Sequence, residues 1–483
     1  MTFDTISFLL FMAVMLFIFY LIPAVHRKYV LFLGSVIFYI SLDWKVFCLA
    51  LGTVIVTFLS GRRIERQIEQ GKSAKILLIG VIVILFVILG IAKYLNFFSE
   101  IVYIVLDFFR VNHSSKVFEL LAMIGISYYT LKAVSYLVEI YQGKIKAEKS
   151  LVSYGTYLLF FPQIIAGPIA TPDSFLPQIN QPLIYKEENI KKAIVLIATG
   201  YMKKLAIANV AAGYVNSVYA AIESRNGLTC LFGAILYSMQ IYCDFSGYSD
   251  ISIGVSALFG IEVKSNFNCP YLSVSIKDFW RRWHISLSSW LRNYVYISCG
   301  GSKKGGLAKI RNTMLTFFVS GLWHGADFTF VFWGIYHGIL NCFCKKVKKQ
   351  EKKSSPKAWV RLGKIGVTFL CVTAGWIFFR ADNFGQAFQM LEKICMEMSF
   401  SEDAILQTIL VFTGDIMSLG YFVSVVGMSI LLMVREYCYT YGKLADATEK
   451  RKEKETIIWI AFCVFAIICL GTFGTSGFIY ANF

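Results

Sequence analysis

Charged residues are scarce in this sequence. Asp, Glu, Lys and Arg make up 16% of its 483 residues, whereas 57% are hydrophobic. Because soluble domains carry about 25% charged residues, this composition excludes an ordinary soluble protein. Apolar stretches near the roughly 20 residues that cross a bilayer recur along the chain. We therefore predict an all-α polytopic membrane protein with roughly 11 to 13 transmembrane or re-entrant helices.

The sequence also lacks the motifs of several enzyme and transporter classes. It contains no G-x-S-x-G nucleophile elbow, no P-loop and no G-x-G-x-x-G after a strand, which argues against serine-hydrolase chemistry and ATP-driven transport. The 12 cysteines show no paired metal-like spacing, and several lie in apolar runs, where Cys behaves as a small hydrophobe. We therefore expect neither a disulfide framework nor a structural zinc site.

No long polar segment predicts a soluble module, so we expect one membrane-embedded domain over residues 1–483. Its core is expected at 120–343, a cytoplasmic basic loop at 345–364 and C-terminal helices at 362–475. Residues 8–23 have no basic segment before them and no small-residue cleavage site after them, which predicts a retained first helix. The expected helices lie near 5–24, 29–42, 45–60, 76–96, 117–140, 191–221, 228–258, 312–324, 327–343, 362–380, 405–434 and 456–475, with a shorter or interfacial helix at 93–113.

Nearly half of the net charge of +17 comes from one loop. Residues 345–364 contain nine Lys or Arg and one acid, Glu351, between two apolar stretches. The positive-inside rule places such a loop in the cytoplasm, and contact with anionic membrane lipids explains its charge. An acidic partner protein is the alternative, and we expect no nucleic-acid binding.

The apolar stretch at 154–168 is interrupted by two prolines and a glycine in Phe161-Pro-Gln-Ile-Ile-Ala-Gly-Pro168. Irregular backbone at membrane depth is tolerated where it is buried in protein or lines a wet cavity. Two interpretations are open: a proline-kinked helix end, or a cavity lined by Gln163 and its neighbours.

Residues 273–296 combine aromatic and charged side chains at helical spacing. Trp280 and Trp283 follow one face, whereas Arg281, Arg282 and Ser286 fall largely on the other. A strongly amphipathic pattern that contains tryptophans and arginines predicts a helix that lies at the membrane interface or dips into it.

The chain has only five histidines, and three of them, His284, His324 and His337, fall within 54 residues. His324 lies in Gly321-Leu-Trp-His-Gly325, in or beside an apolar stretch, so that Trp323 is its neighbour. An ionisable side chain at such depth is costly and indicates a functional site, and a histidine can act as a general base near neutral pH. A hydrogen-bonded core histidine is the alternative. No HExxH-type spacing supports a metal site, so none is expected.

Asp244 and Asp250 lie six residues apart in an otherwise apolar segment. Buried carboxylates are expensive unless they are paired. Arg281 and Arg282 are the partners that the sequence offers, and we expect an architectural ion pair in preference to direct catalysis.

The sequence resembles the membrane-bound O-acyltransferase (MBOAT) family, and more narrowly its bacterial alginate O-acetyltransferase, AlgI-like, subgroup. The resemblance covers almost the whole chain and is strongest at 125–340. The motifs that carry it are Gly125-Ile-Ser-Tyr-Tyr-Thr130, Phe161-Pro-Gln-Ile-Ile-Ala-Gly-Pro168, Asp244-Phe-Ser-Gly-Tyr-Ser-Asp250, Asp278-Phe-Trp-Arg-Arg-Trp-His-Ile-Ser-Leu-Ser288, Gly321-Leu-Trp-His-Gly-Ala326, Trp333-Gly-Ile-Tyr-His-Gly338, Trp376-Ile-Phe-Phe-Arg-Ala381 and Phe478-Ile-Tyr480.

The resemblance implies a bowl of helices pierced by a central tunnel, with His324 at the position of the family's catalytic histidine and His284 at its second polar position. Asn293 stands where the subgroup usually has Asp, which weakens any role at position 293. The remaining candidates would line the tunnel or support it: Gln163, Asp244, Asp250, Trp280, Arg281, Arg282, Trp283, Ser286, Trp323 and His337.

The resemblance further implies a multi-pass protein of the bacterial inner (cytoplasmic) membrane. It would move an acyl, expected to be acetyl, group from a cytoplasmic thioester toward hydroxyls of an exported cell-surface polysaccharide. The donor substrate would be acyl-CoA (acetyl-CoA) or an acyl-carrier thioester, as used by the related protein DltB, without a tightly bound cofactor. An SGNH-type extracytoplasmic acyltransferase would be the partner.

The chemistry of the residues is compatible with this function, because O-acylation needs a base for the hydroxyl proton and donors for the tetrahedral oxyanion. His324 is the expected base. His284, or nearby Trp and Arg N–H groups, would orient the acyl group or stabilise the oxyanion. The alternatives are a transporter or flippase for a polysaccharide or lipid-linked sugar, which broken helices and intramembrane charges also suit, and a structural scaffold of a secretion complex.

Overall fold

The structure is a computed structural model, and it describes residues 1–111, 125–303, 305–344, 358–414, 416–442, 448–473 and 478–479. Every regular element among these residues is helical, which confirms the all-α prediction. The longer helices are α1 (Ile6–Leu21), α2 (Arg27–Leu42), α3 (Trp44–Glu69), α4 (Lys75–Phe108), α5 (Ile126–Tyr141), α6 (Leu151–Leu159), α7 (Pro172–Ile179), α8 (Glu187–Tyr201), α9 (Asn209–Tyr219), α10 (Gly227–Leu258), α13 (Gly306–His324), α14 (Phe328–Phe343), α15 (Ala358–Arg380), α16 (Phe384–Met396), α17 (Glu402–Thr413), α18 (Ile416–Tyr441) and α19 (Glu449–Leu470).

Short or irregular helical segments complete the described chain. They are η1 (Phe161–Gln163), η2 (Met202–Ala208), η3 (Ile222–Ser224), η4 (Pro270–Leu272), α11 (Ile276–Arg282), α12 (Ile285–Leu291) and η5 (Arg292–Tyr296), of which η2 and η5 are π-helical.

Six helical stretches among the described residues are long and apolar enough to cross a membrane: 44–69, 75–108, 187–219, 227–258, 358–380 and 418–441. Two shorter apolar helices, α1 and α14, accompany them. These stretches confirm the prediction of a polytopic membrane protein. On α4 the exposed side chains include Ile79, Val83, Phe86 and Ile91, as expected of a helix surrounded by lipid.

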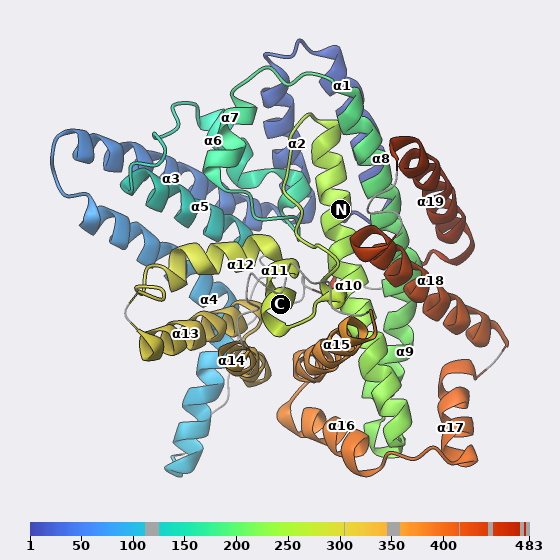
Figure 1. Cartoon of the computed structure of the whole chain (residues 1–483). Helices are drawn as coiled ribbons and strands as arrows, with labels where there is room; N and C mark the ends of the chain where they lie inside the picture. The colour runs from blue at the N-terminus through green and yellow to red at the C-terminus, as the bar shows by residue number, and fades with distance from the viewer. Residues whose placement is uncertain are drawn as a thin grey trace. The chain divides into compact units, whose positions relative to one another are not determined.

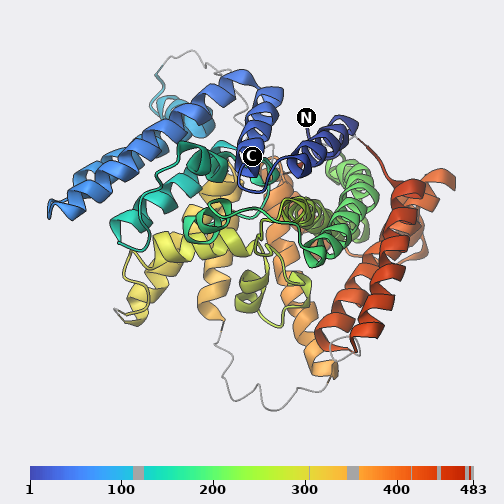
Figure 2. The same ribbon diagram turned by 90° about the horizontal axis from the view of Figure 1, so that it is seen from above.

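The described residues divide into two compact units, so the prediction of a single domain stays a prediction. The first unit comprises residues 1–193 and 252–264, and the second comprises 194–251 and 265 onward. In the first unit α3 and α5 run side by side (Figures 1 and 2).

Several predicted helix boundaries are wrong; α3, for example, ends at Glu69 and not near residue 60. α4 continues to Phe108 because residues 91–108 contain no Gly or Pro, and scattered charges alone do not stop a helix. The helix predicted at 405–434 is divided between α17 and α18, with Gly414 at the end of α17, since Gly has low helix propensity. The helix predicted at 273–296 is broken into α11, α12 and η5.

Other predictions fall partly outside the described residues, as two examples show. The beginning of the helix expected at 117–140 lies there, whereas its remainder forms α5. Most of the basic loop at 345–364 lies there as well, and only its end, from Ala358, belongs to the described part of α15.

In the first unit the proline-containing stretch ends α6 at Leu159, and the short 3₁₀ segment η1 follows. The predicted interruption of the helix at this point is confirmed. Gln163 is buried there, and its Oε1 accepts a hydrogen bond of 2.7 Å from Lys132 Nζ. The prediction that Gln163 lines a cavity stays a prediction.

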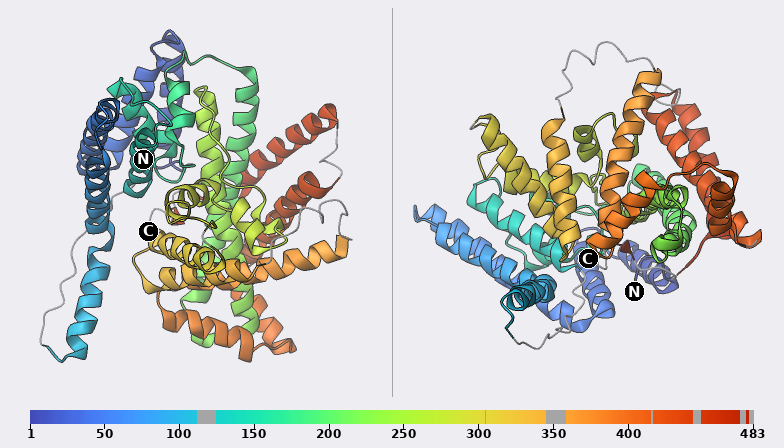
Figure 3. Two further views of the ribbon diagram at one scale, coloured as in Figure 1. Left: turned by 60° about the vertical axis from the view of Figure 1, so that its left-hand side comes forward. Right: turned by 90° about the horizontal axis from the view of Figure 1, so that it is seen from below.

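In the second unit α13 and α14 form a closely packed antiparallel pair (Figures 1 and 3). A Cβ atom at Gly321 would lie 2.4 Å from the backbone oxygen of Phe330, and one at Gly334 would lie 2.4 Å from that of Phe317. Glycine therefore permits the two backbones to meet. The turn between them ends at Asp327, whose side chain caps α14 by accepting a hydrogen bond from Thr329 N–H at 2.7 Å. This turn directly follows His324, the last residue of α13.

Candidate active site

His284 occupies the break between α11 and α12, in a left-handed backbone conformation with φ 43° and ψ 55°. A non-glycine residue in this region carries backbone strain of about 1–3 kcal/mol and persists only where its surroundings hold it there. Such strained residues cluster at functional sites. The periodicity of residues 273–296 predicted a continuous helix because side-chain patterns do not report a single reversed backbone angle.

Asn266 holds this conformation. Its backbone oxygen accepts a hydrogen bond from Ile285 N–H at 2.9 Å, and its side-chain Oδ1 accepts one from Ser286 N–H at 3.1 Å and one from Ser286 Oγ at 2.9 Å. These bonds satisfy N–H groups at the start of α12, which a continuous helix would have bonded to its preceding turn. Asn266 is fully buried and is a functional candidate that the sequence reasoning missed.

Asn266 also fixes the tautomer of His284. The Nδ1 atom of His284 lies 3.2 Å from Asn266 Oδ1. Because Oδ1 already accepts from a backbone N–H, it is the amide oxygen, so His284 Nδ1 must donate. In a neutral imidazole the lone pair then resides on Nε2. His284 can therefore accept a proton or a hydrogen bond at Nε2.

Burial keeps His284 neutral. The side chain is 1% exposed, lies outside the candidate membrane spans and packs edge-on against Phe245, with ring centroids 4.6 Å apart. Desolvation lowers the pKa of His284 to about 3, since burial disfavours the charged form. At neutral pH the imidazole is thus a hydrogen-bonding group and carries no charge.

His324 faces the same space from α13. It is 3% exposed, and its ring packs edge-on against Trp333 at 5.0 Å and against Phe379 at 5.4 Å. The ring centroids of His284 and His324 are 6.4 Å apart. This separation leaves room between the rings for part of a substrate. The structure therefore brings together the two histidines that lie forty residues apart in the sequence.

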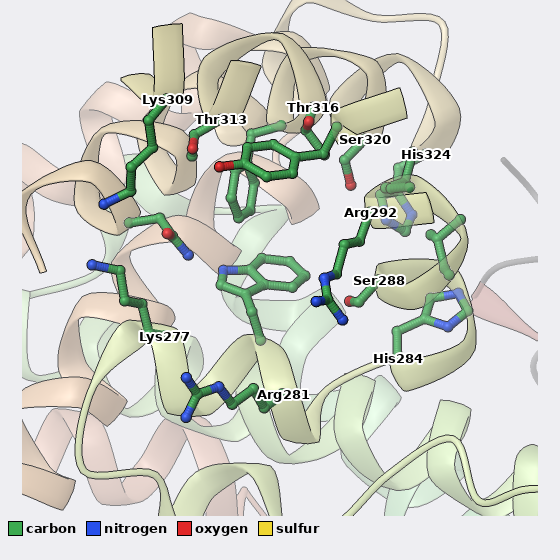
Figure 4. Close-up of a pocket in the computed structure, with 16 residues that line it drawn as sticks. Lys277, Arg281, His284, Ser288, Arg292, Lys309, Thr313, Thr316, Ser320 and His324 are labelled. Carbon is green, nitrogen blue, oxygen red and sulfur yellow. The ribbon is translucent and has the colours of Figure 1, made fainter. Parts of the chain in front are cut away.

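Both histidines line a cavity of about 370 Å³ (Figure 4). The side chains around it are strongly basic: Lys277, Arg281, Arg292 and Lys309 line it, and none of its sixteen described lining residues is Asp or Glu. In Figure 4 the two histidines lie at one end of the cavity and the two lysines lie at the other. The cavity thus combines a pair of imidazoles with a positively charged end.

A polar stripe on α13 forms one wall of the cavity. Lys309, Thr313, Thr316, Ser320 and His324 all line it and are spaced by three or four residues, which places them on one face of the helix. The sequence reasoning missed the first four, although the same spacing was readable from the sequence. Ser288 and Arg292, which also line the cavity, follow His284 at the corresponding positions of the next helical turns.

Four of the predicted supporting residues lie in or beside this site. Trp280 and Arg281 line the cavity. Arg282 instead bonds Asp278, with Nε to Oδ2 at 3.1 Å. Ser286 does not line the cavity, and its hydroxyl holds Asn266 as described above.

Three further predicted residues lie behind the cavity or beside it. Trp283 is 1% exposed and packs against Trp376 at 4.9 Å. His337 is fully buried, with its ring 5.2 Å from Trp280 and 5.1 Å from Trp333. Trp323 is half-buried on α13 and is not among the lining residues.

The predicted partners of the two aspartates are wrong. Asp244 bonds Lys204 at 2.6 Å, and Asp250 bonds Lys203 at 2.8 Å. Of the arginines predicted as partners, Arg281 lines the cavity and Arg282 bonds Asp278. Both lysines come from the π-helical segment η2. A π-helical turn changes which side chains face inward, so that two consecutive lysines both reach α10, an arrangement that α-helical spacing does not suggest.

Gln163 belongs to the first unit and does not line the cavity that holds the histidines.

Comparison with known proteins matches residues 103–380 to the family described as MBOAT, membrane-bound O-acyltransferase family. The chain is 35% identical to the probable alginate O-acetylase AlgI of Pseudomonas aeruginosa, over 81% of this chain and 74% of that protein. It is 32% identical to the peptidoglycan O-acetyltransferase of Helicobacter pylori, over 75% and 72%. It is 34% identical to the teichoic acid D-alanyltransferase of Bacillus subtilis, over 55% and 70%.

Proposed function

Because the chain belongs to the membrane-bound O-acyltransferase family, we propose that it moves an acyl group, expected to be acetyl, from a cytoplasmic thioester across the membrane. The acyl group moves toward hydroxyls of an exported polysaccharide and reaches them through a partner protein. Relatives that are named for alginate, peptidoglycan and teichoic acid support a cell-envelope glycan as the acceptor. The observation that carries the mechanism is the pair of imidazoles, 6.4 Å apart, at one end of a basic cavity.

His324 is the general base in this proposal. It takes the proton as the hydroxyl oxygen of the acceptor, which is the partner in the first transfer, attacks the thioester carbonyl and forms an ester. It returns a proton to the departing thiolate when the C–S bond breaks. No net proton is consumed, so the base is regenerated in each cycle. General base catalysis of this kind contributes typically about 10²- to 10⁴-fold to the rate.

His284 positions the donor. Its lone pair on Nε2 accepts a hydrogen bond, so the neutral ring suits an amide N–H of a pantetheine arm better than it suits an oxyanion. The donors for the tetrahedral oxyanion then come from N–H groups such as those of Trp280 and Arg292, which line the same cavity. The loss of one such donor costs about 10²- to 10³-fold in rate.

The basic end of the cavity favours a donor that carries phosphate. Lys277, Arg281 and Lys309 present positive charge with no carboxylate among the described lining residues, and lysines and arginines are the common phosphate ligands in proteins. Coenzyme A and the phosphopantetheine arm of a carrier protein both meet this requirement, and both present the pantetheine amides that His284 would bind.

The acyl group would be received on the far side of the bacterial cytoplasmic membrane by an SGNH-type partner that completes transfer to the glycan. The six long apolar helical stretches support the multi-pass topology that such transfer across a membrane requires. No cofactor needs to remain bound, because the thioester itself supplies the activated acyl group.

Reconstitution in proteoliposomes tests the proposal. Purified protein is supplied with radiolabelled acetyl-CoA or with an acetylated carrier protein, in the presence of a soluble glycan acceptor and the partner. We expect free thiol and labelled glycan to appear in equal amounts with one of the two donors. Transport of intact glycan without thiol release would instead support a flippase and overturn the proposal.

A further inference from the structure

A second cavity in the same unit lies away from the histidines. It has a volume of about 670 Å³ and is formed by α10, α15, α18 and η4. Figure 1 labels the three long helices. None of its described lining residues is charged. They are Phe232, Ile235, Leu236, Met239, Tyr271, Leu272, Leu362, Ile365, Gly366, Phe369, Phe422, Val426, Ser429, Ile430, Met433, Val434 and Tyr437. We call this cavity the apolar groove.

The lining residues form a stripe on each long helix. On α10 and on α15 they follow the i, i+3, i+4, i+7 spacing of one helix face. On α18 they extend from Phe422 to Tyr437, which corresponds to about 22 Å at 1.5 Å per residue. A phospholipid tail spans one leaflet, or about 15 Å of a hydrocarbon core of about 30 Å. The apolar groove is therefore long enough to hold one acyl chain.

One end of the apolar groove carries a guanidinium. Arg361 Nη2 donates a hydrogen bond of 2.7 Å to the hydroxyl of Tyr437, the last lining residue of α18. The same guanidinium lies 4.5 Å from the ring centroid of Tyr441, and its Nε has no hydrogen-bond partner among the described residues. Arg361 is half-buried. Two tyrosines thus hold the planar fork in place, and a planar guanidinium suits the bidentate recognition of phosphate.

Arg361 also belongs to the basic segment 345–364, which the positive-inside rule places in the cytoplasm. The anionic lipids of the cytoplasmic leaflet attract such segments. This predicted topology would place the charged end of the apolar groove near the phosphates of that leaflet.

We propose that the apolar groove binds one acyl chain of an anionic glycerophospholipid from the cytoplasmic leaflet, with its phosphate on Arg361. The apolar walls alone give little preference, because lipid tails in the bilayer are as apolar as leucine side chains. Selectivity for an anionic headgroup comes from Arg361, and the shape of the apolar groove retains the chain.

Two glycines of α15 provide a matched pair of variants. A Cβ atom added at Gly366 or at Gly363 meets nothing within 4 Å, so that each position accepts a larger side chain. Gly366 lines the apolar groove and Gly363 does not. Gly366→Leu fills the groove, whereas Gly363→Leu changes the helix propensity of α15 in the same way and leaves the groove open.

Native mass spectrometry of the full chain measures the bound lipid, after extraction from membranes that contain equal phosphatidylglycerol and phosphatidylcholine. We expect one retained phosphatidylglycerol in the unmodified protein and in Gly363→Leu, and a loss of at least fivefold in Gly366→Leu. In Arg361→Gln the preference for phosphatidylglycerol over phosphatidylcholine should fall about five- to tenfold.

Equal lipid retention by Gly363→Leu and Gly366→Leu would overturn the proposal. An unchanged headgroup preference in Arg361→Gln would also overturn it. So would a mass spectrum in which the unmodified protein carries a second copy of the chain or another polypeptide and Gly366→Leu has lost it. The measurement does not depend on acyl transfer, so its failure would leave the proposed function untouched.

Discussion

Asn266 determines how His284 is oriented. Two substitutions of Asn266 distinguish the effect of losing its hydrogen bonds from the effect of adding a charge beside His284. Oδ1 of Asn266 accepts hydrogen bonds from His284 Nδ1 at 3.2 Å, from Ser286 N–H at 3.1 Å and from Ser286 Oγ at 2.9 Å. Asn266→Ala removes all three bonds. Asn266→Asp retains an acceptor in the same place and adds a negative charge beside the imidazole.

The two variants should fail in different ways. In Asn266→Ala the tautomer of His284 is no longer fixed, and a misplaced catalytic group costs up to about 10²-fold in rate, which we expect at every pH. Each buried donor left without a partner also lowers the free energy of unfolding by about 1–3 kcal/mol. In Asn266→Asp the ring stays in place, but the carboxylate favours the imidazolium.

The sign and size of the pH effect follow from the charge. Burial lowers the pKa of His284 to about 3 in the unmodified protein, so its neutral form is available throughout the range from pH 5 to 8. A carboxylate about 4 Å away stabilises the protonated form by about 4 kcal/mol at an effective dielectric constant of 20. This interaction raises the pKa of His284 by as much as about three. Protonation of His284 then lowers the rate of Asn266→Asp at the acidic end of the range.

The assay is acetyl transfer in proteoliposomes from pH 5 to 8, expressed as the ratio of each variant to the unmodified protein. The Asp variant should approach the unmodified rate at pH 8 and fall below it as the pH decreases. The Ala variant should be uniformly slow. A ratio for Asn266→Asp that does not change with pH, or full activity of Asn266→Ala, would refute the assigned orientation of His284.

Three other predictions concern the donor and the scaffold. Lys309→Gln should raise the KM for the thioester donor about tenfold with little change in kcat, and added salt should reduce the difference in steady-state assays. Lys204 forms a buried ion pair of 2.6 Å with Asp244. Lys204→Met leaves Asp244 without this cation and should lower the free energy of unfolding in detergent by about 3–5 kcal/mol. Unchanged stability of Lys204→Met would contradict this. Gly321→Ala places a Cβ atom 2.4 Å from a backbone oxygen of α14 and should cost about 1–3 kcal/mol, whereas Gly213→Ala, which meets nothing within 4 Å, should not destabilise the protein in the same melting experiment.

The membrane class and most helices could be predicted from the sequence, because apolar length and charge report directly on the bilayer. The interruption after α6 was predictable from local backbone chemistry, since Pro162 and Pro168 cannot continue a helix. Two of the boundary errors arose where a helix break depends on one residue. Gly414 ends α17 and His284 separates α11 from α12, and the apolar periodicity on either side of each residue predicts a continuous helix.

The candidate site was predicted in part. His284 and His324 could be singled out because a histidine is costly in an apolar setting, and the structure brings them together. Asn266 was missed because its role depends on a loop that folds back onto a residue 18 positions later. Lys203 and Lys204 were missed because a π-helical turn, which no side-chain periodicity announces, directs both toward α10.

Transfer of a labelled acetyl group by His324→Ala tests the central claim most directly. Its control is His26→Ala, which changes a histidine at the beginning of α2 in the other unit. With both variants inserted in proteoliposomes at equal amounts, we expect transfer at the unmodified rate in His26→Ala and a loss of at least about 10²-fold in His324→Ala. Transfer by His324→Ala at the rate of the unmodified protein would contradict the assignment of His324 as the base.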